Sequence, residues 1–314
     1  SSPSNLVSVT LFDGATAVGT AQFVGSNTVA TSTLSSTVIV PKNSDKILTI
    51  KVNLADITNT GSGTGDGTEG AMIAVDNNAS TDVGGTRGTG VGSGSTINAS
   101  GSTSFDGVRV FKSYPTFAQD TLSATGVSDG KLLRFKVTAD SKGSVSINKF
   151  TLTVATTSGV SVSGINVFGY EDAAYSQAVS GVQGSGALAY SNQSPATNSS
   201  SVQLEFFAET SANASTTLVV PAGTTRYFEV RATSITGLTT GSSVTSTLVG
   251  DSTYPALASL MGTSTGIENQ ANTADNFIWS PNATTTSGLN HTDWTNGYNV
   301  PGLPSSGIVQ SRSI

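Results

Sequence analysis

Few residues of this chain have the types and spacing that catalysis needs. The 314 residues include a single histidine, His291, and no cysteine. A Ser-His-Asp triad, a multi-histidine metal centre and a thiolate nucleophile therefore all lack their parts. Carboxylates that paired acid–base chemistry would use are few and scattered, and no glycine-rich loop continues into a phosphate-binding Lys-Ser/Thr pair. We expect a protein that is not an enzyme.

Calcium is the one cofactor that the loop carboxylates suggest. Asp66 and Glu69 lie in a glycine-rich stretch, and Asp76 is followed by two asparagines. Oxygen ligands on flexible loops suit this ion, although neither stretch has the twelve-residue EF-hand pattern. Asp and Asn also favour turns by hydrogen-bonding their own backbone, so turns without metal are the alternative. We expect no other cofactor.

Aromatic residues gather near the C-terminus. Both tryptophans, Trp279 and Trp294, lie in this region, close to Phe277, Tyr298 and Leu303. Trp and Tyr with polar neighbours can stack on sugars or anchor a protein interface. The alternative is that they pin an irregular segment to the nearest domain. These five residues are our candidates for assembly or for anchoring a tail.

The composition favours a secreted protein with many short strands and polar turns. Charged residues make up 11 % of the chain, against roughly 25 % in typical soluble domains. The net charge of −6, with only 14 Lys and Arg, argues against nucleic acid as a partner. No apolar run approaches the roughly 18 to 20 residues of a membrane span, so we expect no membrane insertion. Because extracellular eukaryotic modules usually rely on disulfides, the lack of cysteine favours a bacterial exterior, with the signal peptide removed.

Alternating apolar and polar residues predict strands along most of the chain. Residues 133–137 alternate in this way, and a second alternating run follows a polar turn. We expect these two runs to form a β-hairpin over residues 131–154. The apolar phase slips by one between Ile147 and Phe150, which predicts a β-bulge or a bend between sheets.

Parts of the chain resemble each other. Two copies of one sandwich would explain the similarity, and chance likeness between β-rich stretches is the alternative. The matching pieces are VIVP at 38–41 with LVVP at 218–221, the run Leu48, Ile50, Val52 and Ile57 with the run Phe228, Val230 and Ile235, and VSVTLFD at 7–13 with INVFGY at 165–170.

We therefore predict an all-β fold of tandem immunoglobulin-like β-sandwich domains with an extended C-terminal tail. Residues 1–104 would form a first sandwich ending in a Gly/Ser/Thr-rich loop or linker, residues 105–251 a second sandwich, and residues 252–314 the tail. Since nothing like 131–154 precedes the first strand, the first unit is expected either to lack strands or to be a smaller closed sandwich. If strands are lacking, the open edge would be the strand with Leu6, Val7, Val9 and Leu11.

Several segments resemble a family of surface proteins. They are FKVTAD at 135–140, VPAGTT at 220–225, and above all the terminal DNFIWS at 275–280, DWTNGY at 293–298 and GLP at 302–304. These segments are similar to the large, repetitive exported cell-surface proteins of ultra-small Patescibacteria (Parcubacteria-like). The resemblance covers the second unit and the tail well and the first unit loosely. It implies a place on the cell exterior and a structural or adhesive role, with no catalytic residues.

Two functions follow as expectations. The first is a non-catalytic structural subunit of a bacterial cell-surface assembly, an S-layer or surface filament, whose partners are copies of itself joined by strand or tail exchange. The alternative is a cell-surface adhesin or carbohydrate-binding module with surface glycans as partners.

Overall fold

The computed structural model describes residues 5–24, 27–57, 67–78, 85–100, 107–194, 201–255, 275–283 and 293–314. This part of the chain is all-β, and the helical element named within it is a short 3-10 turn, Val127–Asp129. The chain divides into two compact units, Ser1–Phe111 and Lys112–Ile314. Within the described ranges no helix is long and apolar enough to cross a membrane.

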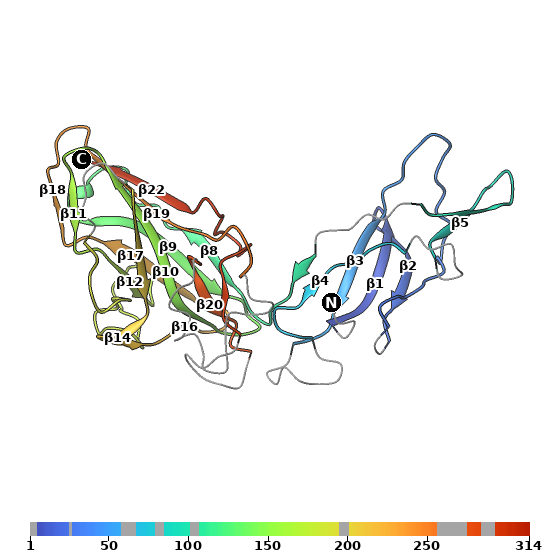
Figure 1. Ribbon diagram of the computed structural model, residues 1–314, viewed down its shortest axis with the longest axis horizontal. Coiled ribbons are helices and arrows are strands. Elements are labelled where there is room, and N and C mark those ends of the chain that lie inside the picture. The colour runs from blue at the N-terminus through green and yellow to red at the C-terminus, as the bar shows by residue number, and fades with distance from the viewer. Residues whose placement is uncertain are drawn as a thin grey trace. The chain divides into compact units, whose positions relative to one another are not determined.

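The first unit is built around a three-stranded antiparallel sheet (Figure 1). In it β1 (Leu6–Asp13) lies between β2 (Thr16–Gln22) and β3 (Thr49–Leu54). Among its described residues, a core cluster has Leu6, Val9 and Ile73 buried, and a few half-buried apolar side chains pack against them. Two short ribbons complete the unit, β4 (Met72–Ile73) with β7 (Val108–Arg109) and β5 (Arg87–Thr89) with β6 (Thr96–Asn98).

The second unit contains two larger sheets that face each other. The four-stranded sheet has the order β12-β17-β9-β8, and the seven-stranded sheet is centred on β10. The strands of the first are β8 (Pro115–Gln119), β9 (Lys131–Ala139), β12 (Asn166–Tyr170) and β17 (Thr225–Arg231). Those of the second are β10 (Val145–Thr156), β13 (Val202–Phe207), β16 (Leu218–Val220), β19 (Ser243–Leu248), β20 (Ile278–Ser280), β21 (Thr295–Asn296) and β22 (Ile308–Ser313). Two small ribbons flank them, β11 (Ser161–Ser163) with β18 (Ser234–Thr236) and β14 (Glu209–Ser211) with β15 (Ala214–Ser215).

Phenylalanine rings fill the space between the two sheets. The ring of Phe150 on β10 lies 5.2 Å from that of Phe135 on β9 and 5.1 Å from that of Phe228 on β17, centroid to centroid. Phe117 of β8 and Phe277 extend the cluster, with their ring centroids 4.9 Å apart. Offset and edge-to-face ring pairs add to the stabilisation that burial of these large side chains already gives.

The two strands predicted for 131–154 form, but they do not pair as a hairpin. β9 belongs to the four-stranded sheet and β10 to the seven-stranded sheet, so the chain crosses between layers at 140–144. Alternation shows which residues face a core, and both strands face the same core from opposite sides. The predicted irregularity is present, since the β10–β20 register shifts between Ile147 and Lys149.

The division of the chain also differs from the prediction. The boundary lies at Phe111–Lys112 rather than at 104–105, because β7 pairs with β4 of the first unit. The described parts of 252–314 belong to the second unit: β20 pairs with β10, and β22 pairs with β19. An extended tail is therefore not what these residues form.

The sequence similarity between the units has a counterpart in strand pairing. In the first unit Val9 of β1 lies opposite Val52 of β3, and in the second Val167 of β12 lies opposite Val230 of β17. The neighbouring residue pairs correspond as well: Leu11–Ile50 with Gly169–Phe228, Thr10–Lys51 with Phe168–Glu229, and Phe12–Thr49 with Tyr170–Tyr227. When β1 is matched to β12 and β3 to β17, the residues that face each other in one pair therefore correspond to those that face each other in the other pair.

Candidate functional site

The C-terminal aromatic residues are mostly inside the second unit. Phe277, Trp279, Trp294 and Leu303 are buried, whereas Tyr298 is 40 % exposed. The pairing of β20 with β21 brings the two tryptophan segments together, and the indole Nε1 of Trp279 donates to the carbonyl of Asn296 at 2.8 Å. A fully buried indole has no free face for a sugar. Their position corresponds to the anchoring alternative rather than to a stacking platform.

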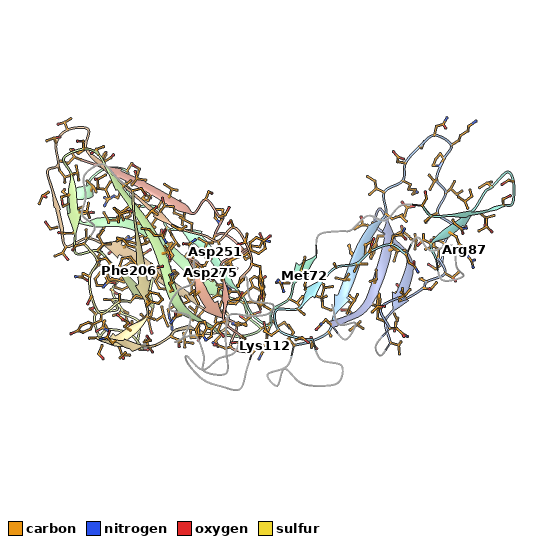
Figure 2. The ribbon with its side chains drawn as sticks, in the orientation of Figure 1. Met72, Arg87, Lys112, Phe206, Asp251 and Asp275 are labelled. Carbon is orange, nitrogen blue, oxygen red and sulfur yellow. The ribbon has the colours of Figure 1, made fainter. Side chains whose placement is uncertain are left out.

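A buried carboxylate holds this segment in place. Asp251, just after β19, accepts the backbone N–H groups of Asn276 at 2.7 Å, Phe277 at 3.1 Å and Gly297 at 2.8 Å. Burial raises the pKa of Asp251 above its usual value, although the three N–H groups act in the opposite direction. Asp251 and Asp275 lie near each other in the second unit (Figure 2), and both carboxylates accept hydrogen bonds from this segment.

A second carboxylate, Asp293, serves the far end of β20. It accepts the hydroxyl of Ser280 and, at 2.7 Å, the backbone N–H of Ala283. No sequence pattern singles out Asp251 or Asp293, since an isolated Asp in a polar stretch is ordinarily a turn residue. What distinguishes them is burial, which only the folded chain reveals.

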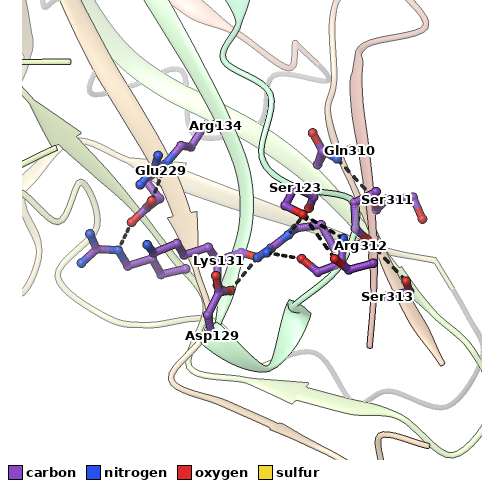
Figure 3. A network of polar contacts seen from close by, with 12 residues as sticks. Ser123, Asp129, Lys131, Arg134, Glu229, Gln310, Ser311, Arg312 and Ser313 are labelled. Carbon is purple, nitrogen blue, oxygen red and sulfur yellow. Dashed lines mark hydrogen bonds and ion pairs between the residues drawn. The ribbon is translucent and has the colours of Figure 1, made fainter. Parts of the chain in front are cut away.

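The last strand is fixed by a buried arginine (Figure 3). Arg312 of β22 donates from Nε to the carbonyl of Ser123 at 2.8 Å and from its terminal nitrogens to the carbonyls of Thr125 at 2.8 Å and Lys131 at 2.6 Å. It also forms an ion pair with Asp129. Partial burial raises the pKa of Asp129, but the hydrogen bonds from Arg312 and from the Lys131 N–H outweigh it and bring the pKa below its usual value.

A buried acid also lies on the four-stranded sheet. Glu229 of β17 is fully buried between the guanidinium groups of Arg134 and Arg231. The Arg134 guanidinium lies 3.8 Å from the ring centroid of Tyr175, whose hydroxyl donates to Asp120 at 2.7 Å. Two guanidinium groups thus neutralise the single buried carboxylate, and aromatic rings lie near both arginines, so this cluster links β9 and β17 of the sheet.

The predicted open edge of the first unit is wrong. Leu6, Val7, Val9 and Leu11 lie on β1, which is hydrogen-bonded to β2 on one side and to β3 on the other. Leu6 and Val9 are buried and Val7 is exposed, a break in strict alternation that coincides with the register shift between Leu6 and Ser8 in the β1–β3 pairing. The period of a strand tells which face a residue occupies and not which strands lie beside it. The sheet edges are β2 and β3.

Among the described residues, the predicted calcium ligands are not part of a group that could hold a metal ion. Asp66 and the histidine His291 lie outside the described residues. Glu69 and Asp76 are described, and the Asp76 carboxylate accepts the N–H of Asn77 at 2.7 Å. Across the described ranges no group of three or more His, Asp or Glu side chains is placed to hold a metal ion.

A hollow adjoins the C-terminal segment of the second unit. It has a volume of about 560 Å³ and is bordered by Asp251, Tyr298, Asn299, Leu303 and Ser305, among others. Tyr298 is thus the one residue of the aromatic set with an accessible ring. Comparisons of the whole chain with protein-family models, with curated proteins and with solved structures gave no match.

Proposed function

We propose that this chain is a non-catalytic structural subunit of a bacterial cell-surface assembly, an S-layer or a surface filament, and that it associates with copies of itself by strand pairing. One observation carries the proposal. The β1–β3 pair has the register of the β12–β17 pair, but among the described residues β3 has no neighbour in the place that β9 takes beside β17. A sheet edge of this kind can accept a strand from another chain.

A second part of the first unit supports the same reading. In the second unit, β16 of the LVVP run pairs with β10. The matching run at 38–40 forms no strand, and Ile39 and Val40 are 58 % and 60 % exposed. Neighbouring apolar side chains left in water are typical of an interaction surface.

Strand pairing at the first unit is favoured over exchange of the C-terminal segment. Exchange would have to withdraw Phe277, Trp279 and Arg312 from buried positions, with the hydrogen bonds of Asp251. The same segment of a neighbouring copy would restore these contacts, but in the opened state that must precede exchange each buried polar group without a partner costs about 1–3 kcal/mol, and the apolar burial is lost as well.

We further propose that both units are variants of one immunoglobulin-like sandwich and that the protein acts outside the cell. The shared register of the two strand pairs supports the first point. The resemblance of segments 275–280 and 293–298 to exported Patescibacteria surface proteins supports the second.

Electron microscopy and sedimentation test the proposal directly. The purified chain is concentrated stepwise, its sedimentation profile is recorded, and each sample is examined by negative stain. Ordered sheets, tubes or fibres that appear as concentration rises are the expected result. A chain that remains a monomer at every concentration, and shows only separate single particles by negative stain, would contradict self-assembly.

An adhesin remains the second candidate because of the hollow beside Tyr298. An exposed aromatic ring next to Asp251, Asn299 and Ser305 offers both a stacking face and hydrogen-bonding groups for a sugar. If this function is correct, the chain binds glycans on an array and loses the signal in Tyr298→Ala. Tyr190→Ala is the matched control, since Tyr190 is 53 % exposed elsewhere in the second unit.

A further inference from the structure

We propose that two copies of this chain pair antiparallel through the outer edges of their β3 strands, with Val52 on the two-fold axis between them. The inference rests on the self-association proposed above and names the strand that forms the contact. Pairing would join two three-stranded sheets into one six-stranded sheet, β2-β1-β3 continuing into its symmetry mate. A two-fold contact uses the same patch on both subunits, so the strand must complement itself.

The two edges of the first-unit sheet are not alike. β2 is interrupted by a bulge at Val18, and the carbonyl of Val18 is occupied, because Ser35 donates both its N–H, at 2.7 Å, and its hydroxyl, at 3.1 Å, to it. For β3, no described residue outside β1 is seen to hydrogen-bond its backbone. Alternate N–H and C=O groups of an edge strand point away from its neighbour and are available to a further strand.

The second unit shows what pattern fits beside such a strand. Next to β17, the strand β9 places Leu133 opposite Val230, Arg134 opposite Glu229 and Phe135 opposite Phe228. Through the shared register, Val52, Lys51 and Ile50 of β3 take the places of Val230, Glu229 and Phe228. A partner strand for β3 therefore needs apolar residues opposite Ile50 and Val52 and a polar residue opposite Lys51.

β3 itself has this pattern when it is reversed about Val52. Val52 then faces its own copy, Ile50 faces Leu54, and Lys51 faces Asn53, so apolar side chains meet on one face and polar ones on the other. Two-fold pairing centred on Lys51 would place like charges directly opposite each other, which is unfavourable. Val52 and Leu54, each 37 % exposed in the single chain, would gain cover. The Lys51 ammonium does not guard the edge, because it lies 4.4 Å from the ring centroid of Phe12.

Single cysteines test the register, since the chain has none of its own. Residues directly opposite in an antiparallel pair have Cα atoms about 4.5–5.5 Å apart, within the range of a disulfide. Val52→Cys in the full chain should therefore form a covalent dimer under mild oxidation. Asn53→Cys is the matched control, because its own copy lies diagonally across at about 7–8 Å. Val91→Cys, at a 92 % exposed loop position, measures linking by random collision.

Charge substitutions at Asn53 test the same pairing without crosslinking. Asn53→Asp would place two carboxylates opposite the two Lys51 ammonium groups, and Asn53→Lys would place like charges there. Cross-strand pairs contribute about 0.2–1 kcal/mol each, so the dimer dissociation constants of the two variants should differ on the order of tenfold at low salt, Asn53→Asp being tighter. Sedimentation equilibrium of the full chain measures both.

The results separate this inference from the proposed function. Dimer linking by Val52→Cys well above both controls, with the charge order Asp, Asn, Lys, supports β3 pairing. Assemblies that form while Val52→Cys links no faster than Val91→Cys would overturn β3 pairing and leave self-assembly standing, with a different strand on the β3 edge. A chain that is monomeric in every variant would overturn both.

Discussion

Replacing Arg312 by alanine should destabilise the second unit strongly and leave the first unit unchanged. The side chain is 3 % exposed, and it supplies hydrogen bonds to the carbonyls of Ser123, Thr125 and Lys131 as well as an ion pair with Asp129. These acceptors lie on the segment that leads into β9, so Arg312 fastens the last strand of one sheet to the start of the facing sheet.

The magnitude follows from what Arg312→Ala leaves behind. Hydrogen bonds to charged groups contribute about 1.5–3 kcal/mol each, but they are not additive here. Ser123, Thr125 and Asp129 are exposed residues, so water can replace part of what is lost. We expect the free energy of unfolding to fall by about 3 kcal/mol, roughly the contribution of two such hydrogen bonds. Arg312→Lys should recover part of this, because an ammonium cannot reach all four acceptors.

Tryptophan fluorescence in a urea titration is the appropriate assay. Both tryptophans of the chain, Trp279 and Trp294, are buried in the second unit, so the signal reports on that unit alone. Arg87→Ala is the control, since Arg87 lies exposed on β5 of the first unit. A loss below about 1 kcal/mol in Arg312→Ala would refute the reasoning, because it would mean that water satisfies the carbonyls as well as the guanidinium does.

Two further predictions concern the carboxylates around the C-terminal strands. Asp251→Asn should lower the free energy of unfolding of the second unit by about 2 kcal/mol, since the amide NH₂ would face backbone N–H donors; Asp140→Asn should be neutral in the same titration, because its oxygen can still accept from Lys142. Asp129→Asn should act in a pH-dependent way: the lowered pKa of Asp129 adds stability above the ordinary value of 3.8 that is lost as pH falls through the folded-state value. Urea titrations of wild type and Asp129→Asn should therefore converge below pH 3.8 and separate above it, and a constant gap would contradict the assignment.

Local pattern predicted the strands well and their partners poorly. The alternation at 133–137 and 145–154 marks β9 and β10 correctly, yet nothing in it says that the two strands lie in different sheets. For β1 the same limit led to a wrong edge, because a run of apolar residues marks a strand and does not show how many strands lie beside it.

The C-terminal strands were missed for a different reason. Gln310 and Arg312 occupy core-facing positions of β22, where the alternating pattern of a half-buried strand ordinarily has apolar residues. Their inward placement is tolerated because both side chains find partners: carbonyls of the 123–131 segment accept from Arg312, and the Gln119 amide donates to Gln310 Oε1 at 3.2 Å. The carbonyls that accept from Arg312 are distant in the sequence, so the local pattern around residue 312 cannot indicate that this arginine faces the core.

The unequal cores of the two units explain why pairing should occur at the first. The second unit buries an aromatic cluster and closes both of its sheets against each other. In the described part of the first, Leu6, Val9 and Ile73 form a small core cluster, and β3, which contains no proline, is an edge of the sheet. A domain with so little buried apolar area is marginal alone, and any partner that binds only its folded form stabilises it. Pairing along β3 would therefore contribute to the folding of the first unit as well as to assembly, which places the two processes at the same strand.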